Sequence, residues 1–428
     1  QEAHNYLDLA LHYAKAGLLE EAVEILQACP EQSPMPSYYE GYLHGLAGDE
    51  AAARACCLRA EHLPAPRCYP NRVEEIAILE YAIRLLGRAP RAHALLGCLL
   101  YDKKQADAAI AHWEASVQQD PGQALVHRNL AIARYNKQGD ADAALREMEQ
   151  ARRLDPGYPR LLLEYDQLAA RLGRSNAARL QLLEENLALV EQRDDLMLRY
   201  VTLLNCEGRC EEALQILLTR RFHPWEGGEG KVSAQYRYAL IRLAKDCLNR
   251  GENDRAVQLL EQSKTYPDTL GEGKLPNVPD NEADYWQGVA LRAMGREPEA
   301  AAAFLRAASG PQEPGRVLYY NDQPSDFIYY QGLAQRAMGN EAAARKAFHK
   351  LLTYGETHLF DAVAYDFFAV SLPEIEVFAD DIALRNRQYC NYLRALGCAG
   401  LGRTSEAAEL FAGILELQPD DQGALRHA

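Results

Sequence analysis

The sequence predicts an all-α protein, a right-handed superhelical solenoid built from antiparallel helical hairpins. The chain has 428 residues. One globular core rarely grows past ~250–300 residues, so we expect several domains or an elongated array. One pattern of apolar residues at helical spacing recurs along most of the chain, which favours the array. In addition, six turn glycines are each followed five residues later by an alanine, a fixed spacing that indicates one repeated unit.

The repeated unit is clearest in residues 90–121. Two stretches with apolar and small residues at helical spacing flank a Lys-Lys-Gln turn, which predicts two helices. Because Gly97 and Ala109 have almost no side chain, the two helix axes can approach closely, and we expect Trp113 to fill the gap toward the next hairpin. Pro121 ends the unit, since proline lacks an amide hydrogen and clashes with the preceding helical turn.

The whole chain is expected to contain about eleven such hairpins, some of them degenerate. The expected segments are N-terminal hairpins in 1–60, a proline-rich loop plus one helix (Val73 to Leu86) in 61–90, regular hairpins in 91–220, hairpins with loop insertions in 221–354, atypical aromatic helices in 355–388, and a last hairpin in 389–428. The unit around Gly139 carries one extra residue in its turn. The six glycine–alanine pairs are Gly173 with Ala178, Gly208 with Ala213, Gly251 with Ala256, Gly295 with Ala300, Gly339 with Ala344, and Gly402 with Ala407.

Composition narrows the possible partners and the compartment. Lysine and arginine total 46 against 61 acidic residues, a net charge of −15, and no basic stripe offsets it, so we expect no nucleic-acid partner. The ten cysteines fall mostly at small or apolar helix positions, where free cysteine packs as a small hydrophobe, which favours a reducing cytoplasm. No apolar run approaches the ~20 residues that span a bilayer. No metal or cofactor site is predicted. The sequence begins at Gln1 inside a helical pattern, and we expect it to be a piece of a longer protein.

The repeat resembles the tetratricopeptide repeat, in which two antiparallel helices occupy about 34 residues. A narrower resemblance, to one bacterial family, is carried by four segments. These are Phe222 to Lys231, Tyr266-Pro267 with Leu270 to Lys274, Tyr365 to Pro373, and Gly97 to Gln105. In that family an uncharacterised β-sandwich domain, similar in fold to galactose mutarotase, precedes a long tetratricopeptide array. The resemblance implies that this chain is the array without its sandwich, and it implies a carbohydrate connection only through that missing domain.

Two loops carry the motif Gly-Glu-Gly-Lys, once within residues 225–231 and once within residues 270–274. Each joins the second helix of one hairpin to the first helix of the next, so we expect the two loops to be neighbours on one edge. A nucleotide-binding loop would need a preceding strand and Ser or Thr after the lysine, and neither is present. The glycines also fit a purely structural role, since they allow positive φ in tight turns while Glu–Lys pairs hold each loop to the adjacent helix.

From these observations we predict that the protein is a non-catalytic scaffold that binds other proteins, and not an enzyme. The expected docking surface for a protein segment, or for the chain's own upstream domain, is the concave groove together with the loop edge. The candidate binding residues are Trp225, Glu226, Glu229, Lys231, Tyr266, Glu272, Lys274, Tyr285 and Trp286. The alternative is an accessory module that completes a carbohydrate-binding or carbohydrate-active site, because carboxylates flanked by aromatic rings suit a sugar. A purely structural spacer is the third possibility.

Overall fold

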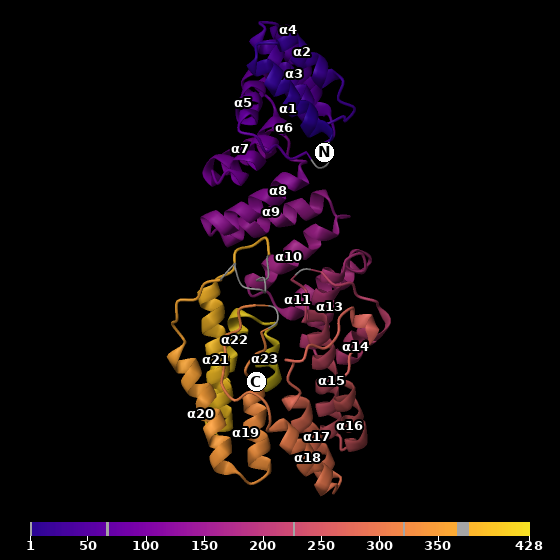
Figure 1. Ribbon diagram of the computed structural model, residues 1–428, viewed down its shortest axis with the longest axis vertical. Coiled ribbons are helices and arrows are strands. Elements are labelled where there is room, and N and C mark those ends of the chain that lie inside the picture. Colours follow the sequence, from indigo (N-terminus) through magenta and orange to yellow (C-terminus); the bar gives the residue numbers. More distant parts are fainter. Residues whose placement is uncertain (1, 66–67, 226, 320–321, 366–375) are drawn as a thin grey trace. The chain divides into compact units, whose positions relative to one another are not determined.

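The structure is a computed structural model that describes residues 2–65, 68–225, 227–319, 322–365 and 376–428. Every regular element in these ranges is a helix, which confirms the all-α prediction. The chain divides into two compact units, unit 1 (residues 1–161) and unit 2 (residues 162–428). Figure 1 shows the helices of both units, and each unit is described here by itself.

Unit 1 consists of hairpins with one additional helix. Its elements are α1 (Glu2–Lys15), α2 (Leu19–Gln27), α3 (Pro34–Leu46), α4 (Glu50–His62), α5 (Glu74–Leu86), α6 (Pro90–Asp102), α7 (Ala106–Gln119), α8 (Ala124–Ala133), the π-helix η1 (Arg134–Gln138) and α9 (Ala141–Leu154). The hairpins are α1–α2, α3–α4, α6–α7 and α8–α9, and α5 packs against α3 and α6. The single helix expected between Val73 and Leu86 is therefore α5.

Unit 2 continues the same pattern. Its elements are α10 (Pro159–Arg171, which crosses the division), α11 (Asn176–Glu185), α12 (Leu187–Val190), α13 (Asp194–Cys206), α14 (Cys210–Thr219), α15 (Lys231–Asn249), α16 (Asn253–Gln262), the 3₁₀-helix η2 (Asp268–Leu270), α17 (Asn281–Ala293), α18 (Glu297–Ala307), α19 (Phe327–Ala337), α20 (Glu341–Thr357), α21 (Ile382–Gly400), α22 (Thr404–Leu417) and α23 (Gln422–His427). Its hairpins include α13–α14, α15–α16, α17–α18, α19–α20 and α21–α22.

One small residue sets how closely the two helices of a hairpin approach. With one exception, the fourth residue of the second helix is a buried alanine, at positions 22, 53, 109, 144, 213, 256, 300, 344 and 407. A larger side chain at this position would push the first helix away and open a void between the axes. The glycine–alanine spacing therefore marks the contact that defines the hairpin.

The exception is α11, and it corrects one of the six predicted pairs. Ser175 caps this helix by accepting a hydrogen bond from the Ala178 amide (3.3 Å). As a result, α11 starts three residues after its turn glycine, whereas the second helices of the other five glycine–alanine pairs start two residues after theirs. Ala178 becomes the third helical residue and is exposed. Arg179 takes the fourth position and is 2% exposed.

The extra residue near Gly139 is absorbed by the helix and not by the turn. Residues Arg134–Gln138 form a π-helical turn, in which each hydrogen bond spans one more residue than in an α-helix. Asp140 then caps α9, and Ala144 still reaches the buried fourth position. The hairpin geometry is thus retained despite the insertion.

Trp113 lies inside its own hairpin, contrary to the expectation that it fills the gap toward the next one. A Cβ atom on Gly97 would come within 2.5 Å of the Trp113 ring, and the indole nitrogen donates to the Ala94 carbonyl at 3.2 Å. Gly97 has no side chain, so the ring lies directly on the first helix. The same contact occurs between Gly288 and Phe304 in the α17–α18 hairpin.

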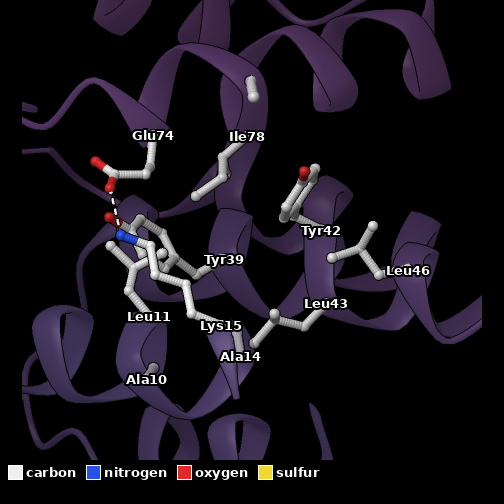
Figure 2. Close-up of a pocket in the computed structure, with 11 residues that line it drawn as sticks. Ala10, Leu11, Ala14, Lys15, Tyr39, Tyr42, Leu43, Leu46, Glu74 and Ile78 are labelled. Atoms are coloured by element: carbon white, nitrogen blue, oxygen red, sulfur yellow. Dashed lines mark hydrogen bonds and ion pairs between the residues drawn. The ribbon is translucent and has the colours of Figure 1, made fainter. Parts of the chain in front are cut away.

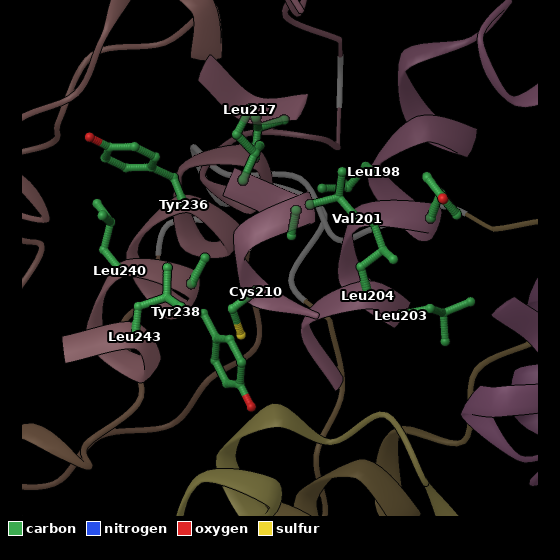
Figure 3. Packing of buried hydrophobic residues seen from close by; sticks show 14 of the residues in the cluster. Leu198, Val201, Leu203, Leu204, Cys210, Leu217, Tyr236, Tyr238, Leu240 and Leu243 are labelled. Atoms are coloured by element: carbon green, nitrogen blue, oxygen red, sulfur yellow. The ribbon is translucent and has the colours of Figure 1, made fainter. Parts of the chain in front are cut away.

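One large apolar cluster lies in unit 1, and several apolar clusters lie in unit 2. The larger cluster of unit 2 runs from Leu162 to Ala290 and is built mainly from α13, α14 and α15. Figure 3 shows leucines of α13 and α15 packing with Leu217 and Cys210 of α14. Tyr238 of α15 borders this cluster and points toward the last part of the chain.

The helices expected within residues 355–388 differ from those observed. α20 extends to Thr357 and α21 begins at Ile382, and residues 358–365 and 376–381 between them carry no helix. Phe360 is 83% exposed there, so the aromatic residue that favoured a helix has no face to pack against. Much of the predicted run, residues 366–375, lies outside the described residues.

The glycine–aromatic contact yields a stability prediction. We expect Gly288→Ala to destabilise the protein by about 1–3 kcal/mol, because its Cβ would lie 2.6 Å from the Phe304 ring. Gly413→Ala is the matched control, since Gly413 is an exposed helical glycine with no neighbour within 4 Å. The control should be neutral or stabilising by up to about 1 kcal/mol. Urea unfolding followed by circular dichroism measures both, and equal effects would contradict the proposed contact.

Candidate partner-binding groove

The two Gly-Glu-Gly-Lys loops lie against each other, as their positions in the repeat predicted. Loop 1 denotes residues 225–231, between α14 and α15, and loop 2 denotes residues 270–274, between η2 and α17. Just before loop 1, the Phe222 amide donates to the Thr269 carbonyl at 2.8 Å. The Gly271 backbone, at φ +76°, sits so close to the Phe222 carbonyl that a side chain there would collide with it. Gly271 therefore permits the contact between the loops.

Glu272 of loop 2 caps the helix that follows loop 1. Its carboxylate accepts from the Gly230 amide at 2.7 Å and from the Ser233 amide at 3.0 Å. Gly230 is the N-cap residue of α15 and has no side chain to satisfy these amides, so a residue 42 positions later does it. Glu229 accepts from the Gly227 amide within loop 1, at 2.8 Å.

Lys274 fixes the start of α17 in a similar way. Its ammonium group donates to both carboxylate oxygens of Asp280, at 2.7 and 2.6 Å, and Asp280 is the N-cap residue of α17. Lys231 is the first residue of α15. Glu226 lies outside the described residues. The loop residues Glu229, Glu272 and Lys274 thus make contacts within the chain, and these contacts position the first helices α15 and α17.

The four aromatic candidates fall into two places. Trp225 and Tyr266 pack against the large core of unit 2, and the backbone of Gly228 lies on the Trp225 indole. Tyr285 and Trp286 are adjacent on α17, and Trp286 packs against the same core. The Lys245 ammonium lies 5.1 Å from the Trp286 ring centroid, and the Tyr285 ring lies 6.1 Å from that of Tyr330. Three of the four aromatic candidates thus pack on one core cluster, and Tyr285 lies next to Trp286 on α17.

The pair on α17 borders a groove that contains the last residues of the sequence. Residues 419–428, called the groove segment below, include α23 and lie among helices of unit 2 (Figure 1). Their side chains contact α11, α13, α15, α17, α19, α21 and α22. The first helices of successive hairpins thus supply most of the groove, as the repeat predicts for its concave face.

Arg426 anchors one end of the groove segment. Its guanidinium donates to Glu282 of α17 at 2.6 Å, lies 3.8 Å from Asp326, and sits 5.4 Å from the Tyr238 ring centroid. The Glu282 carboxylate also accepts from the Tyr330 hydroxyl at 2.7 Å. Burial by itself would raise the pKa of Glu282, but the Arg426 charge, the Lys245 charge and the Tyr330 hydrogen bond act together against it, and the pKa lies below its ordinary value.

His427 sits in a cage of aromatic rings beside Arg426. The rings belong to Tyr329 and Tyr330 of α19, Tyr392 of α21 and Phe411 of α22, at centroid distances of 5.4, 5.8, 6.1 and 6.1 Å. Burial among these rings lowers the pKa of His427 to about 3, although the nearby Glu282 charge acts in the opposite direction. The imidazole is therefore neutral at ordinary pH.

Asp420 anchors the other end of the groove segment through two arginines. Arg179 donates to Asp420 at 2.9 Å and makes a two-bond pair with Asp166 of α10, at 2.8 and 3.1 Å. Arg199 of α13 donates to Asp166 at 2.7 Å and lies 3.6 Å from Asp420. Burial would raise the pKa of Asp166, but the Arg199 charge and the Arg179 hydrogen bonds hold it below its ordinary value. Arg179, which takes the place of the usual alanine at the fourth position of α11, thus binds the groove segment through Asp420.

Further hydrogen bonds join α10, α11 and α15 to later segments of unit 2. Asn176 of α11 donates to the Pro419 carbonyl at 2.7 Å, and Arg171 of α10 donates to Glu376 at 2.6 Å. Gln235 of α15 and Gln422 of α23 exchange amide hydrogen bonds at 2.9 and 2.7 Å. Polar side chains thus contact the groove segment at Pro419, Asp420, Gln422 and Arg426.

Unit 1 contains an apolar pocket of its own. The pocket has a volume of about 250 Å³ and lies between α1, α3 and α5. Figure 2 shows Leu11, Tyr39, Tyr42 and Leu43 around it, with an ion pair between Lys15 and Glu74 (2.7 Å) at its edge.

Other classes of site receive no support from the described part of the chain. Its helices include none that is both long and apolar enough to cross a membrane. Within the same residues, no three His, Cys, Asp or Glu side chains gather as metal ligands would. The ten cysteines are free thiols.

Sequence reasoning missed the residues that bind the groove segment. Asp166, Arg179, Glu282 and Arg426 are far apart in the chain, and each resembles an ordinary charged helix residue. The sequence contains one signal for the position of Arg179. Ser175, two residues after the turn glycine Gly173, is a strong N-cap residue, and a cap at this position moves the start of α11 by one residue. The partners of Arg426 leave no comparable trace in the sequence.

Comparison with known proteins gives one family match and several similar structures. Residues 326–354 match the family model of the tetratricopeptide repeat, and they correspond to the α19–α20 hairpin. Among solved structures, the Naa15/Naa10 complex bound to HypK-THB is 14% identical, with 91% of this chain and 64% of that chain covered and a TM-score of 0.41. YrrB, described as a TPR protein with an unusual peptide-binding site, is 14% identical over 53% and 96%, with a TM-score of 0.33. A tetratricopeptide repeat protein from Parabacteroides merdae is 16% identical over 71% and 100%, with a TM-score of 0.30.

The contact between the loops predicts unequal effects of two glutamate substitutions. Glu272→Ala removes two hydrogen bonds to the start of α15 and should destabilise the protein by about 1–2 kcal/mol. Glu229→Ala removes one hydrogen bond inside loop 1 and should cost less, about 0.5–1 kcal/mol. Urea unfolding of both variants tests the order, and a larger loss for Glu229→Ala would contradict the assignment of Glu272 as the cap.

The pKa of His427 predicts a pH dependence of stability. The pKa of His427 is about 3 in the folded protein and ~6.5 when the imidazole is exposed. The contribution of the neutral His427 to the free energy of unfolding is therefore complete above pH 6.5 and is lost as the pH falls. Between pH 7 and pH 5 the loss should reach about 2 kcal/mol. The control is His427→Phe, which retains a ring and does not titrate.

The measurement is urea unfolding followed by tryptophan fluorescence in a Trp113→Phe background, so that both remaining tryptophans lie in unit 2. Burial raises the pKa values of Asp326 and Asp421, and these carboxyls act in the opposite direction. They are present in both proteins, so the difference between wild type and His427→Phe isolates the histidine. Parallel pH profiles for the two proteins would refute the prediction.

Proposed function

We propose that the chain is a non-catalytic protein-interaction scaffold and that the groove of unit 2 binds a short protein segment. The groove segment is the occupant of this groove within the chain itself. One observation supports the proposal above the others: both ends of the groove segment are held by charged side chains from helices distant in sequence. Arg179 and Arg199 hold Asp420, and Glu282 holds Arg426.

The nature of the contacts favours a bound ligand over a core element. In the groove segment, Ala424 belongs to an apolar core cluster of unit 2, and the His427 ring packs on Tyr392 and Phe411 of that cluster. The remaining contacts are hydrogen bonds, ion pairs and ring contacts, and the Arg426 side chain keeps 23% of its surface exposed. Partly buried ion pairs add little net free energy, because desolvation offsets most of their attraction. Release of the segment would therefore remove the Ala424 and His427 contacts from one apolar cluster, while water solvates the charges on both sides.

The loop edge has a supporting role in this proposal. Glu272 and Lys274 fix the starts of α15 and α17, and these helices supply Gln235, Lys245 and Glu282 to the groove. Docking of a partner, or of an upstream domain, directly on the loops would have to compete with these internal contacts. The carbohydrate alternative ranks second, since Trp225 and Tyr266 are partly buried against the core and offer less ring surface for a sugar.

A peptide in trans tests the proposal. A fluorescently labelled peptide of residues 418–428 should bind weakly to the wild-type chain, because the groove segment competes for the same groove. It should bind at least tenfold more tightly to a full-length Asp420→Asn/Arg426→Gln variant, whose own segment has lost both charged anchors. Fluorescence anisotropy measures the affinity, and circular dichroism checks that the variant retains its helices.

A scrambled peptide of the same composition is the control. Saturable binding to the variant, with weaker binding to wild type, is the expected result. If the labelled peptide binds neither protein while the variant remains helical, the groove is not a peptide site and the segment is a fixed part of unit 2.

A further inference from the structure

We infer that the groove of unit 2 recognises partners by the order of two charges. The partner is a protein segment that carries a carboxylate followed, six residues later, by an arginine, and it displaces residues 419–428. This inference rests on the proposed function and names its ligand class. The spacing is that of Asp420 and Arg426, the two charged residues of the segment that reach opposite charges across the groove.

The two anchoring sites differ in sign and lie on different helices. The carboxylate site consists of Arg179 of α11 and Arg199 of α13, both already joined to Asp166. Two guanidinium groups face one buried carboxylate there, so the three side chains leave a net positive charge that a second carboxylate balances. Asp420 supplies it, at 2.9 Å from Arg179.

The arginine site is correspondingly negative. Glu282 and Asp326 both approach the Arg426 guanidinium, at 2.6 and 3.8 Å, and the hydroxyls of Tyr330 and Tyr392 donate to these two carboxylates. The Tyr238 ring, 5.4 Å from the guanidinium carbon, adds a surface on which a planar cation can stack. A guanidinium therefore suits the site better than the ammonium of lysine, which makes no planar stacking contact.

The chain between the anchors is constrained as well. Asp421 accepts from the Ala424 amide at 2.8 Å and starts the short helix, which sets the distance between the two charges. A Cβ atom on Gly423 would lie 3.0 Å from the Tyr392 ring, so this position favours a small residue. A matching partner should therefore be able to form one helical turn between its charges and should carry a small residue three positions after its carboxylate.

The experiment compares four labelled peptides on the full-length Asp420→Asn/Arg426→Gln chain. They are the native 418–428 sequence, its Arg426→Lys variant, its Arg426→Gln variant, and a peptide in which positions 420 and 426 exchange residues. The exchanged peptide has the same composition and net charge as the native one. We expect it to bind at least 30-fold more weakly than the native peptide, and the lysine peptide about tenfold more weakly.

A substitution in the groove identifies the contact. Glu282→Gln, made in the same chain, should weaken the native peptide strongly and the Arg426→Gln peptide much less, because the second peptide has already lost the guanidinium. Equal weakening of both peptides would show that Glu282 supports the fold rather than the ligand. If Glu282→Gln loses its helical signal, the peptide series alone decides.

The outcomes separate the two proposals. If the native and exchanged peptides bind equally well, recognition by charge order is wrong and the scaffold proposal stands. If no peptide binds, the scaffold proposal fails first. If the native peptide binds and the exchanged peptide does not, both proposals hold, and a search for partners can be restricted to segments with this charge pattern.

Discussion

The close approach of two helices at one small residue is the constraint on which the structure depends. A buried alanine at the fourth position of the second helix brings the helices of nearly every hairpin together, and glycine–aromatic contacts tighten several of them. In α11 the start of the helix moves by one residue and Arg179 enters this position. A charge placed there needs partners in a low-dielectric surrounding. Asp166, Arg199 and Asp420 supply them, so the exception to the repeat is also the place where the groove segment is held.

The groove differs from the apolar cores in the interactions that hold it. Apolar clusters gain free energy in proportion to the area removed from water, and they have no alternative partner in solution. Ion pairs and hydrogen bonds can be exchanged for water with little net change. Ion pairs and hydrogen bonds hold both ends of the groove segment, and Ala424 and His427 add apolar and ring contacts. The His427 ring adds a pH-dependent component, since its burial lowers the pKa of the imidazole to about 3.

The two Gly-Glu-Gly-Lys loops stabilise the starts of the helices that follow them. Gly230 leaves the start of α15 without a capping side chain, and Glu272 from the next loop supplies the cap. Lys274 binds Asp280 at the start of α17. Both helices contribute side chains that contact residues 419–428, so the loops help to position these contacts.

The sequence alone determined the helical class, the hairpin repeat, the proximity of the two loops and the single helix between Val73 and Leu86, because these depend on local spacing and on contacts between successive elements. The contacts predicted for Ala178 and Trp113 were wrong. Ala178 is displaced by a one-residue shift at the start of α11, and Trp113 packs inside its own hairpin and not toward the next one. Both outcomes are decided by packing. Only the tertiary structure decided which charges meet. Glu282 and Arg426 are 144 residues apart, and their pairing depends on how the hairpins of unit 2 curve around residues 419–428. That curvature is the sum of many small rotations between neighbouring hairpins, and no local pattern in the sequence specifies it.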